Sequence, residues 1–182
     1  PQGTPDFEII DVSDPLNPEK LSEHDLPGVV EGVHVENKIV YLAAGYAGLR
    51  ILDVSDPSAP VALGYMQGGN ENLAYAHEVF VVGDTVYLCD YYQGLKMVDV
   101  GDASNPVLIG SWSLPDASCG YAEDIYVENN IAYIAAGVYG LWIVDVAEPA
   151  NPVSLGAVQG IDATGVWVAN DRAYVVADGT IV

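Results

Sequence analysis

Apolar residues in this chain come in short runs that recur in the same order along its length. Between residues 29 and 68 these runs, with some polar residues among them, lie at Val33–Glu36, Ile39–Ala43, Leu49–Val54 and Val61–Tyr65. Runs of this length suit β-strands and are too short for ordinary helices. Asn, Gly and Pro residues separate them, as in the turns between antiparallel strands. The pattern therefore predicts four strands, which we call A, B, C and D in chain order.

The same four-strand pattern then repeats. Tyr41, Tyr87, Tyr133 and Tyr174 occupy one position of strand B and stand 46, 46 and 41 residues apart. A period in the forties, in sequence that is all of β type, is typical of a propeller with one blade per repeat. We therefore predict an all-β fold, a β-propeller of four-stranded antiparallel blades, with three complete blades plus a half blade at each end.

The predicted units follow one another as a single propeller region over residues 1–182. They are strands C and D of a first blade (1–28), three complete blades (29–68, 69–115 and 116–160) and strands A and B of a further blade (161–182). The two half blades could combine into one blade and close a ring of four. However, Gly179–Val182 already resembles the start of another strand C, which favours part of a longer propeller. Unpaired strands at the two ends would also allow self-assembly.

Turn residues and packing support this scheme. Strands A and B are joined by two-residue turns of Asn, Asp, Gly and Lys, at positions 37–38, 83–84, 129–130 and 170–171. Such residues tolerate the positive φ of primed hairpin turns. A glycine precedes strand C at positions 48, 94 and 140. The run Leu141–Val144 has no polar alternation, so strand C should be buried on both faces.

Strand C and the residues after it carry a family resemblance. The strings LRILDVSDP, LKMVDVGDA and LWIVDVAEP, with FEIIDVSDP near the start, resemble the LVIVD repeat. The resemblance covers essentially the whole chain. It implies a secreted or cell-surface bacterial or archaeal β-propeller, and it implies no catalytic residue within the repeat. The Asp-Val pair is expected to serve core packing and turn formation.

Charge excludes several classes of partner. The chain has 26 acidic and 5 basic residues, for a formal net charge of −21. Nucleic-acid binding requires a basic surface, and an anionic membrane would repel this chain. No apolar run reaches the roughly 18 residues needed to span a bilayer. The acidity favours an extracellular or high-salt protein kept soluble by charge, although it could also attract divalent cations or a basic partner.

Strand direction gathers tyrosines and acids on one face. In an antiparallel meander the B–C and D–A connections lie on one side of the ring. We expect the binding residues there to be Tyr46, Tyr75, Tyr91, Tyr92, Tyr121 and Tyr139, with Glu31, His77 and Glu123 at the mouth of the central channel. Tyrosine and acids compose adaptable binding surfaces, here for a protein, a glycan or a cationic group. Alternatively, these tyrosines cap the apolar rims of the blades.

Catalytic signals are weak. The sequence has no nucleophile elbow, zinc-protease helix or phosphate-binding loop. We therefore expect a non-catalytic interaction or structural scaffold without a cofactor. The alternative is a hydrolase-like propeller whose polar or metal site lies at the channel mouth, with a divalent cation held by Glu31, His77 and Glu123.

The two cysteines suggest a disulfide. Cys89 ends a strand B and Cys119 lies in the long connection that leads to the next blade. Both fall on the predicted recognition face, in neighbouring blades, so we predict a bridge between them. The competing interpretation is a small buried thiol at position 89 and an unrelated exposed one at position 119.

Overall fold

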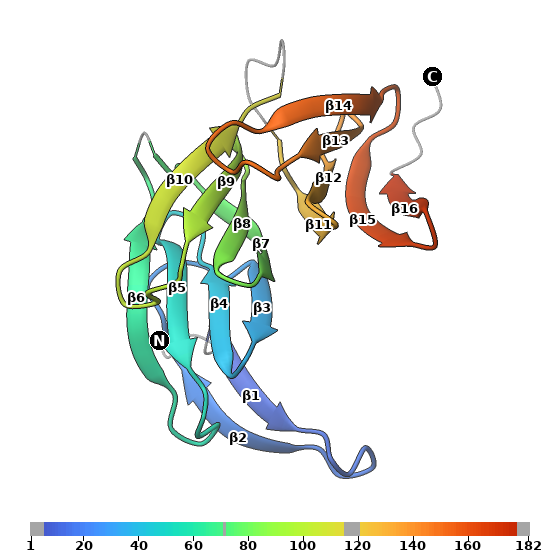
Figure 1. Cartoon of the computed structure of the whole chain (residues 1–182). Coiled ribbons are helices and arrows are strands. Elements are labelled where there is room, and N and C mark those ends of the chain that lie inside the picture. Colours follow the sequence, from blue (N-terminus) through green and yellow to red (C-terminus); the bar gives the residue numbers. More distant parts are fainter. Residues whose placement is uncertain (1–5, 71, 115–120, 178–182) are drawn as a thin grey trace.

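The computed structural model describes residues 6–70, 72–114 and 121–177 of the 182-residue chain. The described residues form β-strands joined by turns and loops, with no helix among them (Figure 1). It follows that none of them belongs to a helix able to cross a membrane. The all-β prediction is thus confirmed.

Three sheets hold four antiparallel strands each, and every sheet follows the order of the sequence. Repeat 1 consists of β3 (Gly32–Glu36), β4 (Ile39–Ala43), β5 (Gly48–Asp53) and β6 (Val61–Gln67). Repeat 2 consists of β7 (Ala76–Val82), β8 (Thr85–Asp90), β9 (Gly94–Asp99) and β10 (Val107–Trp112). Repeat 3 consists of β11 (Asp124–Glu128), β12 (Ile131–Ala135), β13 (Leu141–Asp145) and β14 (Val153–Val158).

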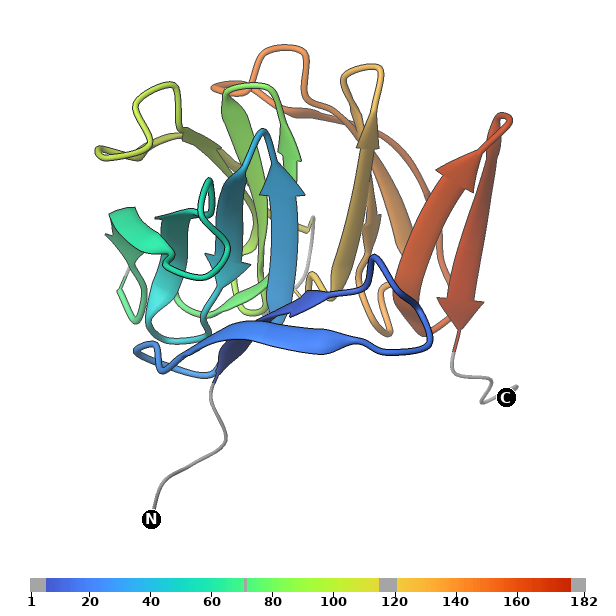
Figure 2. The same cartoon turned by 90° about the horizontal axis from the view of Figure 1, so that it is seen from below.

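A two-stranded sheet flanks the repeats on each side. The first pair is β1 (Phe7–Asp11) with β2 (Glu19–His24), and the last is β15 (Ala163–Ala169) with β16 (Arg172–Ala177). The sheets follow one another along an arc that stays open between these two pairs, as Figures 1 and 2 show. The two pairs belong to separate sheets, so they do not combine into a closing blade within the described residues.

The hairpin turns have the predicted backbone. Both central residues have positive φ in three A–B turns, at Asn37 and Lys38, Asn129 and Asn130, and Asn170 and Asp171. In the fourth, Gly83 has a φ of 58°. Glycine is also required before strand C, because Gly48, Gly94 and Gly140 have φ between 82° and 86°. These turns set the register of each meander.

The aspartate of the repeated motif shapes the turn after strand C. The Oδ1 atom of Asp53 accepts a hydrogen bond of 2.7 Å from the Ser55 N–H group. Asp11, Asp99 and Asp145 accept equivalent bonds from the residues two positions later. This is the Asx turn, in which a short acidic side chain replaces a backbone acceptor. The motif residue therefore serves the turn, as its sequence context indicates.

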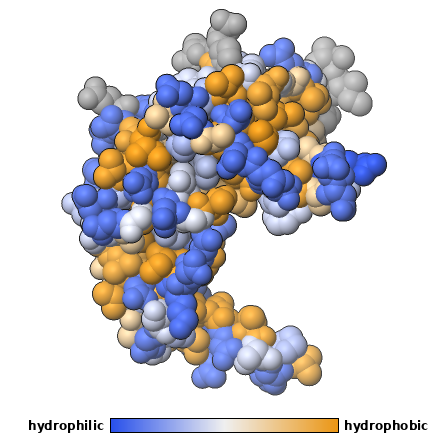
Figure 3. All heavy atoms as spheres, in the orientation of Figure 1, coloured by the Kyte–Doolittle hydropathy of each residue, from blue (hydrophilic) through white to orange (hydrophobic). Residues whose placement is uncertain are grey.

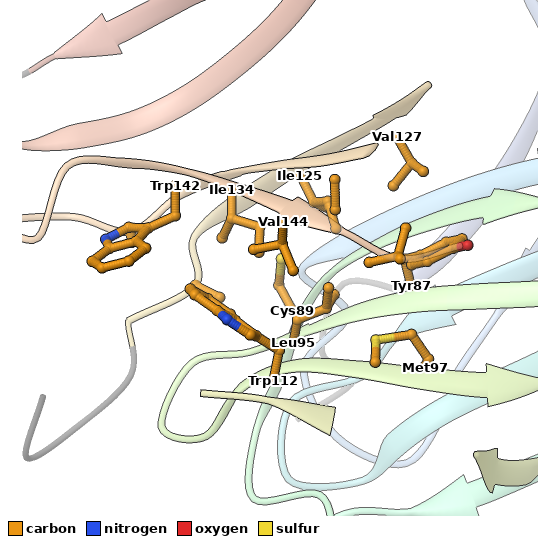
Figure 4. Close-up of a cluster of buried hydrophobic side chains, with 14 of the residues drawn as sticks. Tyr87, Cys89, Leu95, Met97, Trp112, Ile125, Val127, Ile134, Trp142 and Val144 are labelled. Atoms are coloured by element: carbon orange, nitrogen blue, oxygen red, sulfur yellow. The ribbon is translucent and has the colours of Figure 1, made fainter. Parts of the chain in front are cut away.

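Side chains from neighbouring sheets form the core. Figure 4 shows Tyr87, Cys89, Leu95 and Met97 of repeat 2 facing Ile134 and other residues of repeat 3. The Trp112 and Trp142 ring centroids lie 5.6 Å apart in this layer. An equivalent layer joins repeats 1 and 2. Strand β9 between them is buried from Gly94 to Val98, so both of its faces are covered as predicted.

A repeated contact fixes the spacing of the sheets. Strand D carries a one-residue bulge followed by a glycine, at Gly64, Gly110 and Gly156. A Cβ atom at Gly64 would lie 2.2 Å from the Ala103 carbonyl oxygen, and one at Gly110 would lie 1.8 Å from the Pro149 carbonyl oxygen. Gly64 and Gly110 thus leave room for the C–D turn of the next repeat to pack against strand D. Gly156 has no atom within 4 Å of its Cβ position, so no turn packs there among the described residues.

Hydrophilic and hydrophobic side chains are mixed on the surface. Figure 3 shows hydrophilic and hydrophobic residues interspersed over this side of the molecule, with the opening of the arc between the two ends. The exposed apolar residues include several of the flanking pairs and of β14, where the neighbouring sheet is incomplete.

Candidate recognition face

Backbone bridges between neighbouring repeats bring the B–C and D–A connections together. Gly45, in the B–C turn of repeat 1, exchanges two 3.0 Å hydrogen bonds with Ala76 at the start of repeat 2. Gly137 and Ala163 form the same bridge between repeat 3 and the last strand pair, with bonds of 2.8 Å. The loops predicted to share one face therefore do so.

The six predicted tyrosines form one continuous row across the three repeats. Successive ring centroids are 4.8 Å apart for Tyr46 and Tyr75, and 6.1 Å apart for Tyr75 and Tyr92. The row continues from Tyr92 to Tyr91 at 5.2 Å, and from Tyr91 to Tyr121 at 4.9 Å. It ends with Tyr121 and Tyr139, which are stacked at 6.2 Å. We call these six residues the tyrosine row.

Asp90 anchors the middle of the tyrosine row, and sequence reasoning missed it. Its side chain is fully buried at the end of β8. The carboxylate accepts hydrogen bonds from the N–H groups of Ala74 at 2.6 Å, Tyr75 at 3.3 Å, Tyr92 at 3.0 Å and Gln93 at 3.1 Å. It thus ties the D–A connection to the B–C turn. The available signal was an aspartate at a position where the other repeats have Ala44 and Ala136.

Glu31, Tyr75, His77, Tyr91 and Tyr92 surround a hollow of about 310 Å³ on this face. The Tyr75 hydroxyl donates a 2.5 Å hydrogen bond to the Glu31 carboxylate. This bond, together with desolvation, raises the pKa of Tyr75 to about 12. Tyr75 therefore remains a neutral donor at physiological pH, and Glu31 is held at the edge of the hollow.

Glu123 contacts His77 but does not itself line this hollow. His77 Nδ1 is 2.9 Å from the backbone carbonyl oxygen of Glu123, whereas the Glu123 carboxylate lies beside Gly137, near Asp162. Partial burial raises the pKa of Glu123. The structure thus places Glu31 and His77 in the lining of the hollow, whereas Glu123 is not part of that lining. Over residues 6–70, 72–114 and 121–177, no three His, Cys, Asp or Glu side chains are grouped so that they could hold a metal ion.

Two further carboxylates connect the strands that line the inside of the arc. Asp124 Oδ2 accepts a 2.7 Å hydrogen bond from the Val166 N–H group of the next strand pair. Glu78 packs against Gly32, where a Cβ atom would lie 2.5 Å from its Oε1 atom. Burial raises the pKa of Glu78. Asp124 thus hydrogen-bonds across neighbouring sheets, and Glu78 packs between them.

The predicted disulfide is not supported. Cys89 is a free, fully buried thiol in the layer between repeats 2 and 3. Burial raises its pKa well above the usual value for a thiol, and nearby carboxylates add to the effect. Cys119 lies outside the described residues. Position 89 therefore matches the competing interpretation of a small buried thiol.

A larger hollow of about 530 Å³ lies between the end of β2 and repeat 1, with Leu26, Pro27 and Leu63 among its lining residues. Its charged residue, Arg50, lies 4.9 Å from the Tyr65 ring centroid and donates to the Leu49 carbonyl oxygen. Ligand sites are mostly apolar but also contain a few polar groups that fix the ligand. Here the Arg50 guanidinium is already engaged by its neighbours, and the hollow borders a two-stranded sheet, so the hollow at the tyrosine row is the stronger candidate.

Comparison with known proteins assigns the family. The LVIVD repeat model matches residues 27–67, 74–113 and 119–159, one match for each four-stranded sheet. The chain belongs to the LVIVD repeat family. No curated protein matches it.

Two solved structures share the fold. The computationally designed Ika8 protein has a TM-score of 0.64 at 11% sequence identity, over 87% of this chain and 46% of that chain. The computationally designed Ika4 protein has a TM-score of 0.63 at 11% identity, over 86% of this chain and 90% of that chain. This chain thus spans about half the length of the Ika8 chain. At such low identity the similarity concerns the fold alone.

Proposed function

We propose that the chain is a β-propeller segment that acts as a non-catalytic interaction or structural scaffold outside the cell or on its surface. Its three sheets are the complete blades, and the flanking pairs are half blades. The packing of successive meander sheets face to face along an arc supports this assignment, because propeller blades pack in the same way. The LVIVD repeats and the net charge of −21 support the location.

The observation that carries the proposal is the continuity of the tyrosine row across three repeats. Tyr46 is 61% exposed and Tyr92 is 44% exposed. Residues that only cap the rim of a blade would pack closely against it, whereas these two side chains are substantially exposed. Tyrosine supplies apolar contact area together with a polar hydroxyl, which suits recognition of a protein or a glycan.

Binding of the purified chain to intact cells and isolated cell envelopes of its source organism tests the proposal. We expect the double variant Tyr46→Ala/Tyr92→Ala to lose most of this binding, because two exposed rings are removed. Tyr46→Phe/Tyr92→Phe should retain more of it. Tyr174→Ala, which removes an exposed tyrosine from β16, is the matched control. Equal binding by the alanine double variant and the unchanged chain would refute the recognition role of the tyrosine row.

A further inference from the structure

The three tyrosines of the hollow face different directions. The ring planes meet at 67° for Tyr75 and Tyr91, at 77° for Tyr75 and Tyr92, and at 88° for Tyr91 and Tyr92. Rings at nearly right angles form the walls of a cavity and cannot serve together as one flat platform. The His77 ring, 5.5 Å from Tyr91, adds a further side.

The electrostatics of the hollow favour positive charge. The face of an aromatic ring is negative, so a cation near it is attracted. The Glu31 carboxylate adds a full negative charge at the rim. None of the chain's five basic residues lines the hollow, although all five lie in the described part. The net charge of −21 increases attraction for a positively charged partner.

The walls are also held in place before any ligand binds. Asp90 fixes the backbone at Tyr75 and Tyr92, which come from different connections. Glu31 fixes the Tyr75 hydroxyl, and the Tyr91 N–H group donates a 2.9 Å hydrogen bond to the Tyr75 carbonyl oxygen. A cavity formed in advance binds at lower entropic cost.

We propose that the hollow formed by Glu31, Tyr75, His77, Tyr91 and Tyr92 binds an organic cation, namely an ammonium or guanidinium group presented by the partner. This inference rests on the proposed recognition role of the same face. The hollow of about 310 Å³ is at the small end of ligand sites, so it suits one cationic head group. An anionic group would instead be repelled by the Glu31 carboxylate at the rim.

Calorimetric titration with small capped amino acids tests the inference. The probes are the N-acetyl, N-methylamide derivatives of trimethyl-lysine, lysine and arginine, which distinguish quaternary ammonium, primary ammonium and guanidinium. The decisive comparison is a neutral isostere of the trimethyl-lysine probe in which carbon replaces the quaternary nitrogen. We expect at least one cationic probe to bind and the isostere to bind at least about tenfold more weakly, since shape is conserved and only charge is lost.

Variants of the hollow should change this preference. Tyr92→Ala should weaken cation binding about 2- to 30-fold, and Tyr92→Phe should retain it, because the ring and not the hydroxyl faces the cation. Glu31→Gln should weaken binding of the cations without weakening that of the isostere. Tyr174→Ala should leave all affinities unchanged. Circular dichroism spectra identical to that of the unchanged chain would show that each variant folds.

The two proposals fail separately. Equal affinity for the cation and its isostere, or no binding of any cationic probe at millimolar concentration, would overturn the cation site. If the alanine double variant still lost binding to cells in that case, the recognition face would stand with a different ligand. If the double variant kept full binding to cells while the probes bound, the hollow would bind cations without being the recognition surface.

Discussion

At the scale of single residues, one buried carboxylate holds the middle of the tyrosine row in place. Asp90 accepts hydrogen bonds from four backbone N–H groups and exposes no part of its side chain. A buried charge is tolerated when such donors satisfy it. The alanines at the same position in repeats 1 and 3 cannot hold two connections together in this way. The central repeat thus gives the tyrosine row a carboxylate anchor that repeats 1 and 3 lack at this position.

The Tyr75 hydroxyl should ionise at an unusually high pH. Its pKa is raised from 10.0 to about 12, first by the hydrogen bond to Glu31 and then by desolvation. A folded-state pKa above the unfolded value means that this contribution to stability is fully present below about pH 10 and is lost as pH rises through about 12. We expect Glu31→Gln to shift one tyrosine ionisation to lower pH in a tyrosinate absorbance titration. Tyr75→Phe should remove that ionisation, and an unchanged titration in Glu31→Gln would contradict the assignment.

The Cys89 thiol should not react with alkylating reagents while the chain is folded. Its thiol is fully buried and its pKa is raised, so the reactive thiolate is scarce. Iodoacetamide treatment followed by peptide mass spectrometry should leave Cys89 unmodified under native conditions and alkylate it in denaturant without reductant. Protection that persists in denaturant until a reductant is added would instead show that the cysteine is in a disulfide.

At the scale of elements, the D-strand glycines offer a direct comparison. Gly110→Ala places a Cβ atom 1.8 Å from the Pro149 carbonyl oxygen, whereas Gly156→Ala meets no atom within 4 Å. We expect Gly110→Ala to destabilise the chain by about 1–3 kcal/mol through overpacking. Gly156→Ala should have no such cost and could stabilise by ~0.4–1 kcal/mol through the unfolded chain. Urea unfolding measures the free energy of unfolding of the two variants. Equal values would show that the Pro149 turn can move to accommodate a Cβ atom at position 110.

The elements were predictable from sequence because they depend on local signals. Residues Ile39–Ala43 form a strand as predicted, and Asn129 and Asn130 adopt the positive φ that their turn requires. Strand direction also placed Tyr46 and Tyr92 on one face. The hydrogen bonds of Asp90 join residues from separate connections, and no local pattern indicates such bonds. The predicted disulfide relied on proximity in the fold, which does not determine whether a thiol at position 89 is buried or bridged.

At the scale of the whole molecule, stability should vary from the middle of the arc to its ends. Repeat 2 packs against a complete sheet on both sides, whereas each flanking pair has one neighbour. Arrays in which each unit contacts only its neighbours open from their ends. We expect native-state hydrogen exchange to be slowest in β8 and β9 and fastest in β1–β2 and β15–β16. Uniform protection of all the sheets would show instead that the arc unfolds as one cooperative unit.

The contact at Gly64 and Gly110 also has an evolutionary consequence. Each repeat has a strand-D glycine that leaves room for a carbonyl oxygen in the C–D turn of the next repeat. A duplicated repeat therefore already contains both the glycine and the turn that this contact requires. Recombination between copies of the repeat can therefore change its number without any new packing solution. The tyrosine row does not share this freedom, because it depends on Asp90, which repeat 2 alone has at that position of strand B among the three complete repeats. The number of repeats and the proposed recognition site are thus under separate structural constraints.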